Sequence, residues 1–193
     1  MSFRGKLKRL IYSSCPGFAG HFPYYGTNIY FPRGDALFKL VCEQGTFEPE
    51  IVRTLTQIAQ PGTFVFDVGA NIGLMAAPIL HACGNCHVVS FEPSPNTLPF
   101  LLRTVSNSPN NARWNVVGKG LSDRSGELEF VLGSPAETLF EGFKSATRLS
   151  NAAVVEVPVS TLDDEWEAMG RPPISGLKIG VAGSEGLVLH GGA

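Results

Sequence analysis

Residues 63–73, Thr63-Phe-Val-Phe-Asp-Val-Gly-Ala-Asn-Ile-Gly73, join a short apolar run to a turn rich in glycine. The run is rich in β-branched and aromatic residues, which is typical of a fully buried strand in a parallel sheet. Gly69, Asn71 and Gly73 then break the strand, and residues 74–77 favour a helix. A strand, a tight turn and a helix predict the opening of a βαβ unit, whose ligands bind beside this turn.

The spacing and charge of the turn bear on the kind of ligand. Gly69-x-Asn71-x-Gly73 is one residue shorter than the dinucleotide fingerprint G-x-G-x-x-G, and Asp67 closes the strand just before it. Two unit charges about 4 Å apart interact by roughly 4 kcal/mol at an effective dielectric near 20. A carboxylate here therefore disfavours a pyrophosphate and favours an ammonium or sulfonium, and S-adenosylmethionine carries both cations. A glycine turn that binds no ligand is the alternative.

A second buried strand, residues 88–91, is followed directly by Glu92, 25 positions after Asp67. An acid about 20 residues beyond a glycine turn, at the end of the second strand, is placed to accept hydrogen bonds from ribose hydroxyls. The alternative is a surface glutamate that caps the next helix. Together the two strand ends predict a nucleoside site at one edge of a parallel sheet.

Six short motifs follow one another from about Gly45 to the C-terminus. They are Phe47-Glu48-Pro49-Glu50, Pro61-Gly62, residues 65–73, Phe91-Glu92-Pro93, Gly120-Leu121-Ser122-Asp123 and Ser160-Thr161-Leu162-Asp163. In this order and spacing the chain resembles the FkbM-type family of class I S-adenosylmethionine-dependent methyltransferases. The resemblance implies an α/β, Rossmann-like class I methyltransferase fold with a mostly parallel sheet and helices on both faces. It also implies methyl transfer from S-adenosylmethionine to oxygen on a small acceptor, such as a sugar or secondary metabolite.

The same resemblance places the site residues. Seven are predicted to bind the cofactor: Asp67, Gly69, Asn71, Gly73, Glu92, Ser122 and Asp123. Ser122 and Asp123 match the family position that faces the adenine, and the alternative for them is a simple turn before Gly126. A general base helps when the acceptor is a hydroxyl, and Glu185 and Asp123 are the retained candidates for that catalytic role.

Near the C-terminus the chain departs from its family. The family pattern is Lys-Ile-Asp-Val-Glu-Gly, whereas this chain has Gly180 and Ala182 at the two acidic positions and retains Lys178. The family also continues past Ala193, so we expect a sheet that lacks its C-terminal strands, in a truncated or decayed copy. An exposed strand edge of that kind could be covered by a homo-oligomer. The alternative functions are a noncatalytic S-adenosylmethionine-binding protein and, disfavoured by Asp67, an NAD-dependent oxidoreductase.

The 193 residues suit one domain, and 44% hydrophobic with 17% charged residues indicates a folded globule. A net charge of −2 gives no reason to expect nucleic acid as a partner. The apolar run that follows the basic residues of the first ten positions ends too early for the core of a signal peptide. We therefore expect a cytoplasmic protein without a membrane span. A weak contact of this basic start with a membrane surface is the alternative. Residues 1–46 are predicted to be an irregular, aromatic-rich segment and residues 47–193 the methyltransferase domain.

Four cysteines occur, and Cys83-Gly84-Asn85-Cys86-His87 matches the C-x-x-C-H pattern of c-type haem attachment. Zinc would need further ligands that the local sequence does not supply. The segment falls where a turn between helix and strand is expected, so ordinary loop and core cysteines are favoured. We therefore predict neither a metal site nor disulfides.

Four local patterns complete the expectations. Residues 115–121 are expected to form a third strand, less strongly apolar than the first two. Pro78 predicts that the helix after the glycine turn begins late, near Met75, or kinks. Residues 127–132 alternate in polarity and are expected to pair with residues 154–159, where Pro158 indicates an edge strand. Residues 133–153 form a long polar connection, which we expect to contribute part of the acceptor site.

Overall fold

The computed structural model describes residues 6–7, 10, 20–134, 138–146 and 152–192. Its central sheet is parallel and comprises β3 (Phe64–Val68), β4 (His87–Phe91), β5 (Trp114–Val117) and β10 (Ile174–Ile179). The spatial order is β10-β3-β4-β5, so the first strand in the sequence lies between the second and the fourth. This is the order of a doubly wound sheet, with its switch point between β3 and β10. The predicted Rossmann-like α/β fold is confirmed.

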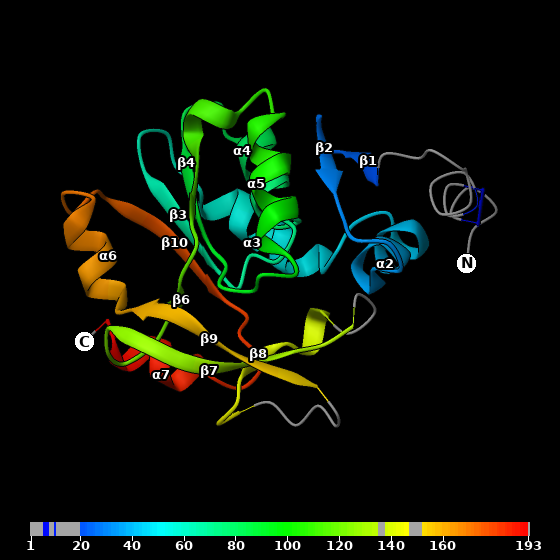
Figure 1. Cartoon of the computed structure of the whole chain (residues 1–193). Helices are drawn as coiled ribbons and strands as arrows, with labels where there is room; N and C mark the ends of the chain where they lie inside the picture. The colour runs from blue at the N-terminus through cyan, green and yellow to red at the C-terminus, as the bar shows by residue number, and fades with distance from the viewer. Residues whose placement is uncertain (1–5, 8–9, 11–19, 135–137, 147–151, 193) are drawn as a thin grey trace.

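Helices cover both faces of this sheet (Figure 1). Helices α3 (Pro49–Ile58), α4 (Ala76–Ala82) and α5 (Leu98–Ser106) share a hydrophobic core with Val65 and Val88. On the opposite face α6 (Leu162–Ala168) and α7 (Glu185–His190) pack against Phe66, Val89 and Phe91. Alternate residues of β3 and β4 thus enter opposite cores, which explains why both strands are apolar throughout.

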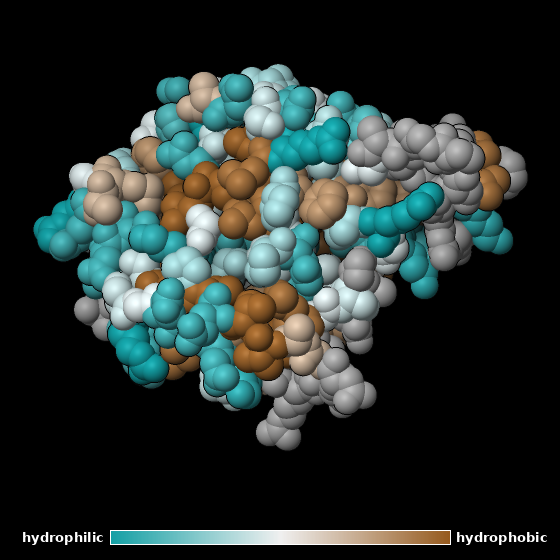
Figure 2. Space-filling view, viewed as in Figure 1, coloured by the Kyte–Doolittle hydropathy of each residue, from teal (hydrophilic) through white to brown (hydrophobic). Residues whose placement is uncertain are grey.

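A second, mixed sheet lies below the parallel sheet in Figure 1. It comprises β6 (Gly120–Leu121), β7 (Gly126–Leu132), β8 (Gly142–Phe143) and β9 (Ala153–Ser160), in the order β6-β9-β7-β8. The predicted pairing of β7 with β9 is confirmed, and it is antiparallel. Figure 2 shows hydrophobic side chains gathered in two separate areas of this face, one over each sheet, with polar residues between them.

Two expectations about this region are wrong. The single strand expected over residues 115–121 is two strands in different sheets, β5 and β6, because the chain leaves the parallel sheet at Gly118. Pro158 does not mark an edge, since β9 lies between β7 and β6. Pro158 lies opposite Glu127 of β7, and the ladder with β6 uses only the next two residues, so the proline is accommodated at the start of that ladder.

The segment expected to be irregular contains regular elements. Its described part holds the hairpin β1 (His21–Tyr24) and β2 (Thr27–Tyr30), followed by α2 (Ala36–Gln44). Asp35 caps α2 by accepting a hydrogen bond from Phe38 N at 2.8 Å, and Gly45 ends the helix in the left-handed conformation with φ 86°. The buried aromatic residues of this segment join the core that α3, α4 and α5 form.

Helix α4 begins at Ala76, directly after Met75, which confirms the late start predicted from Pro78. The proline then lies in the first turn, where its missing N–H removes no helical hydrogen bond. Among the described residues, no helix is both long and apolar enough to cross a membrane. Most of the basic start of the chain lies outside the described residues.

Candidate functional site

A cavity of about 250 Å³ lies between the carboxyl ends of the parallel strands and the second sheet. This is close to the lower end of the volumes typical of small-molecule sites. Its wall includes the turn after β3, the end of β4, the end of β10, and parts of β6, β7, β8 and the short helix η2 (Thr138–Phe140). The cavity therefore lies at the switch point of the sheet, where the sequence predicted a ligand.

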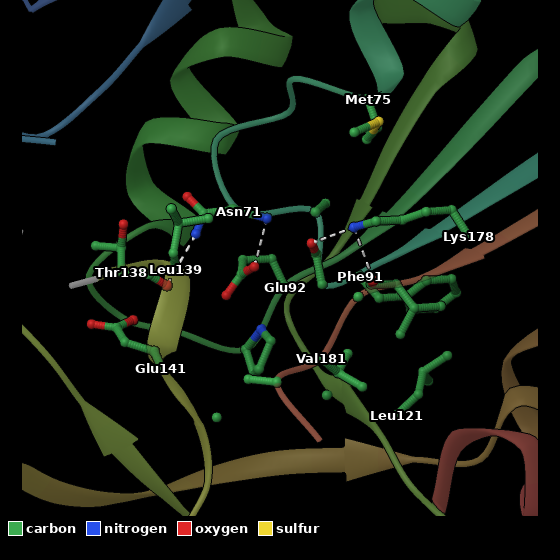
Figure 3. A pocket seen from close by; sticks show the side chains of 18 of the residues that line it. Asn71, Met75, Phe91, Glu92, Leu121, Thr138, Leu139, Glu141, Lys178 and Val181 are labelled. Carbon is green, nitrogen blue, oxygen red and sulfur yellow. Dashed lines mark hydrogen bonds between the residues drawn. The ribbon is translucent and has the colours of Figure 1, made fainter. Parts of the chain in front are cut away.

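Glu92 and Asn71, which the sequence predicted to bind the cofactor, lie together at the wall of this cavity (Figure 3). Glu92 Oε2 accepts a hydrogen bond from Asn71 N at 2.7 Å, and Glu92 Oε1 accepts one from Ser94 N at 2.8 Å. Burial raises the pKa of Glu92 and the nearby Glu141 carboxylate raises it further, while these hydrogen bonds lower it. The main chain thus holds the Glu92 carboxylate at the cavity wall beside the glycine turn.

The two glycines of the turn have different roles. Gly69 lines the cavity with φ 74°, and an added Cβ would lie 2.1 Å from Gly180 O of the neighbouring chain segment. Gly73 is not among the lining residues, and a Cβ there would lie 2.7 Å from the Trp114 ring. The structure therefore explains Gly73 by packing under the turn rather than by contact with a ligand.

Asp67 is fully buried and does not line the cavity, contrary to its predicted place beside the ligand. Its Oδ1 lies 3.1 Å from Lys178 Nζ, although neither carboxylate oxygen has a partner with hydrogen-bond geometry. Lys178 also donates to Gly69 O at 2.9 Å and to Val68 O at 3.3 Å. Because an ammonium already neutralises it, Asp67 cannot by itself select a cationic ligand.

The charge of the cavity comes from other residues. Four carboxylates and one ammonium line it, namely Glu48, Glu92, Glu141, Glu185 and Lys178. Asn71 Oδ1 is buried and has no hydrogen-bond partner among the described residues. An acidic wall with a free acceptor fits a ligand that carries positive charge and hydrogen-bond donors, and it disfavours a pyrophosphate.

Ser122 and Asp123 lie outside the set of residues that line the cavity, and Gly120 and Leu121 of β6 line it instead. Ser122 N donates to Ser160 O at 2.9 Å, which continues the pairing of β6 with β9, and Ser122 Oγ donates to Asp123 Oδ1 at 3.1 Å. The pair is therefore occupied in a turn, which is the alternative interpretation of this motif. The geometry supports neither its adenine contact nor the role of Asp123 as a base.

Glu185, the other candidate base, does line the cavity. It lies at the start of α7, and its Oε1 accepts from Gly183 N at 3.3 Å and Val181 N at 3.4 Å. Hydrogen bonds from main-chain N–H groups lower the pKa of this carboxyl group. Glu185 is therefore ionised at neutral pH but is a weak proton acceptor.

Glu141 is a buried cavity residue that the sequence did not single out. It accepts hydrogen bonds from Ser94 Oγ at 2.5 Å, Asn96 Nδ2 at 2.7 Å and Gly133 N at 3.0 Å. Its side-chain partners are 45 and 47 positions away, so no local pattern could reveal it. The expectation that residues 133–153 contribute to the site gains support from Glu141 and its neighbours, while residues 135–137 and 147–151 lie outside the described chain.

The cysteines lie apart from the cavity. Cys83 and Cys86 are buried, and the Arg113 guanidinium donates to both of their carbonyls, at 2.9 and 2.8 Å. Burial raises the pKa of Cys86 to about 12, so its thiol stays protonated. Within the described ranges no three His, Cys, Asp or Glu side chains form a metal-binding group, and Cys15 lies outside them. These contacts support the interpretation as loop and core cysteines.

Three comparisons relate the chain to known proteins. A family model described as the methyltransferase FkbM domain matches residues 67–193. The hexuronic acid methyltransferase AglP of Haloferax volcanii is 27% identical over 147 residues, which cover 75% of this chain and 56% of that protein. The chain thus spans about half the length of this relative.

Solved structures give two further similarities. The FkbM methyltransferase of Methylobacillus flagellatus matches with a TM-score of 0.46 and 14% identity, over 83% of this chain and 48% of that chain. P. horikoshii TYW2, in complex with MeSAdo, matches with a TM-score of 0.35 and 17% identity, over 63% of this chain and 51% of that one. Because the family model covers well over half of the sequence, the chain belongs to the FkbM methyltransferase family.

Proposed function

We propose that this chain binds S-adenosylmethionine in the cavity and serves methyl transfer to oxygen on a small acceptor, such as a sugar or a secondary metabolite. The observation that carries the proposal is the 2.7 Å hydrogen bond between Asn71 N and Glu92 Oε2. It fixes the acid of the second strand against the glycine turn of the first, in one cavity. The relative from H. volcanii supports the acceptor class, because its name gives a sugar acid as the acceptor.

The cavity residues fit this cofactor. The Glu92 carboxylate can accept hydrogen bonds from ribose hydroxyls, and Asn71 Oδ1 can accept one more from the ligand. The remaining carboxylates favour the positive charge of a sulfonium. When bound, S-adenosylmethionine supplies an electrophilic methyl group. The chain's own residues then have to orient the acceptor oxygen and exclude water.

A second candidate is binding of the cofactor without methyl transfer. Gly180 and Ala182 line the cavity where the family has two acids, and Glu185, which remains, has a lowered pKa. A positioned general base typically contributes 10²–10⁴-fold to rate. A chain that lacks one would keep affinity for the cofactor and lose most of its turnover. The cytoplasmic location and a homo-oligomer both stay predictions.

Calorimetry with S-adenosylhomocysteine and with NAD tests the proposal. We expect S-adenosylhomocysteine to bind at micromolar concentration and NAD to bind at least 100-fold more weakly, because NAD would bring a pyrophosphate to an acidic wall. The reverse order of affinities would overturn the proposal. Transfer of a labelled methyl group to a panel of hexuronic acids and neutral sugars then separates the two candidates. Binding without transfer to any of them would favour the noncatalytic one.

A further inference from the structure

The ammonium of Lys178 is enclosed by oxygen atoms at the end of β3. Lys178 lies opposite Asp67 in the register of β10 and β3, and Lys178 Nζ lies 3.1 Å from Asp67 Oδ1. The same Nζ donates to Gly69 O at 2.9 Å and to Val68 O at 3.3 Å. The two main-chain carbonyls thus accept hydrogen bonds from the ammonium, and the carboxylate adds an ion pair without hydrogen-bond geometry. We call these three oxygens the ammonium cage.

Gly180 makes room for this conformation of the lysine. Residues two apart on a strand project from the same face, so position 180 is the neighbour of Lys178 on that face. A Cβ on Gly180 would lie 3.0 Å from both Cε and Nζ of Lys178. The absence of a side chain at position 180 therefore leaves the space through which Lys178 reaches the cage.

The cage is part of the cavity wall. Lys178, Val68, Gly69 and Gly180 all line the cavity, and Figure 3 shows the lysine extending toward the glycine turn opposite Glu92. The Lys178 side chain is only 12% exposed and that of Asp67 is fully buried. A cage that neutralises an internal ammonium at this depth offers the same contacts to the ammonium of a ligand.

We propose that Lys178 is a specificity-determining residue, because its ammonium occupies the site that would otherwise take the primary ammonium of a ligand's amino acid part. The inference rests on the proposed function, since the ligand is the adenosyl cofactor. It predicts that the cavity binds the nucleoside part of the cofactor and that the amino acid part adds little to the binding affinity. The ligand's ammonium enters the cage only when the lysine withdraws.

The test compares two ligands that differ in the amino acid part. Methylthioadenosine has no ammonium, whereas S-adenosylhomocysteine has one. By calorimetry we expect wild-type protein to bind the two with affinities within about threefold of each other. In Lys178→Met the buried Asp67 loses its partner, and a ligand ammonium can replace it. In that variant we expect S-adenosylhomocysteine to bind at least tenfold more tightly than methylthioadenosine.

Gly180→Asp provides a second variant that keeps the lysine. Its carboxylate would draw the Lys178 ammonium outward, so the preference for S-adenosylhomocysteine should rise about fivefold even if Lys178→Met does not fold. Lys39→Met, at an exposed position of α2, is the matched control and should leave the ratio unchanged. A wild-type preference of tenfold or more for S-adenosylhomocysteine would overturn the inference, as would an unchanged ratio in both cage variants.

The same data separate this inference from the proposed function. Methylthioadenosine binding to the wild type, together with an unchanged ratio in the variants, would overturn the role of Lys178 alone. If neither nucleoside binds to the wild type or to any variant, the proposed function itself is wrong and the inference is overturned with it.

Discussion

The ends of β4 and β10 border the same cavity but present different chemistry to it. After β4, the Glu92 carboxylate faces the cavity and is held by main-chain N–H groups on both of its oxygens. After β10, Gly180 has no side chain, and the preceding Lys178 bends back into the ammonium cage. One end thus presents a fixed carboxylate to the cavity, whereas the other lacks a strong proton acceptor. Under the proposed function, cofactor binding and activation of the acceptor would therefore depend on separate strand ends.

Gly69→Ala should have the largest effect on stability. Gly69 lies between the ends of β4 and β10, since its N–H donates to Phe91 O and its Cα faces Gly180 O. Its Cβ would lie 2.1 Å from Gly180 O, at a residue with φ 74°. The left-handed backbone costs about 1 kcal/mol and the overlap about 3 kcal/mol more, so we expect about 4 kcal/mol of destabilisation in chemical denaturation. Gly62→Ala is the matched control, with φ 77° and nothing within 4 Å, and should lose only about 1 kcal/mol. Equal losses would mean that β10 does not constrain the turn.

A chain of hydrogen bonds connects Asn71, the partner of Glu92, to the buried Asp35 at the start of α2. Asn71 Nδ2 donates to Thr138 O at 3.2 Å, and Thr138 Oγ1 donates to Asp35 Oδ2 at 3.4 Å. Burial raises the pKa of Asp35 from its ordinary value of 3.8 to about 6. The folded state therefore binds this proton more tightly than the unfolded state does, and protonation of Asp35 stabilises the fold.

Comparison of wild type with Asp35→Asn tests this effect. As the pH falls from 7 to 4, the free energy of unfolding of the wild type should rise relative to the variant by about 3 kcal/mol, from a shift of about 2 pKa units. The rise should be spread evenly over the window from about pH 6 to pH 4, between the folded and unfolded pKa values, and should level off below it. Glu50→Gln, on the exposed side of α3, controls for general acid effects. A relative stability that is independent of pH would contradict the buried carboxylate.

Glu92→Gln tests directly whether the end of β4 holds the ligand. Hydrogen bonds to a charged group contribute about 1.5–3 kcal/mol, and 1.4 kcal/mol corresponds to tenfold in affinity. We expect the variant to bind S-adenosylhomocysteine about 100-fold more weakly in calorimetry, while circular dichroism shows the same fold. An affinity within threefold of the wild type would show that the end of β4 does not hold the nucleoside.

Sequence predicted the parts of the fold that depend on strong local patterns. The buried runs of β3 and β4, the late start of α4 just before Pro78, and the β7–β9 pairing all follow from apolar periodicity and proline placement. The helix α2 escaped prediction because glycines, prolines and aromatics dominate its surroundings, although Asp35 and Gly45 are ordinary cap residues for it. The two-residue strand β6 is too short to show any period.

The site was harder to predict because its contacts join distant segments. Glu92 followed from its position at a strand end, whereas Glu141 depends on partners in another loop, including Ser94 and Asn96. Asp67 was placed correctly at the strand end, but its ion pair with Lys178 arises from a strand 111 positions later in the sequence. A charge assigned from local sequence is therefore meaningful only when the residue across the sheet is known.

Glu185→Gln should have the smallest effect. It changes a carboxylate near the end of β10 in the same way as Glu92→Gln does after β4. The Glu185 carboxylate is held by Gly183 N and Val181 N, at 3.3 and 3.4 Å, and glutamine keeps one oxygen that can accept the same bonds. Its pKa is lowered, so its ionisation lies below the range from pH 6 to 8. We expect the affinity for S-adenosylhomocysteine to change by no more than about threefold, with the same pH dependence as the wild type. A loss as large as that of Glu92→Gln would mean that the β10 end also holds the cofactor, and the separation of binding from activation would then be untenable.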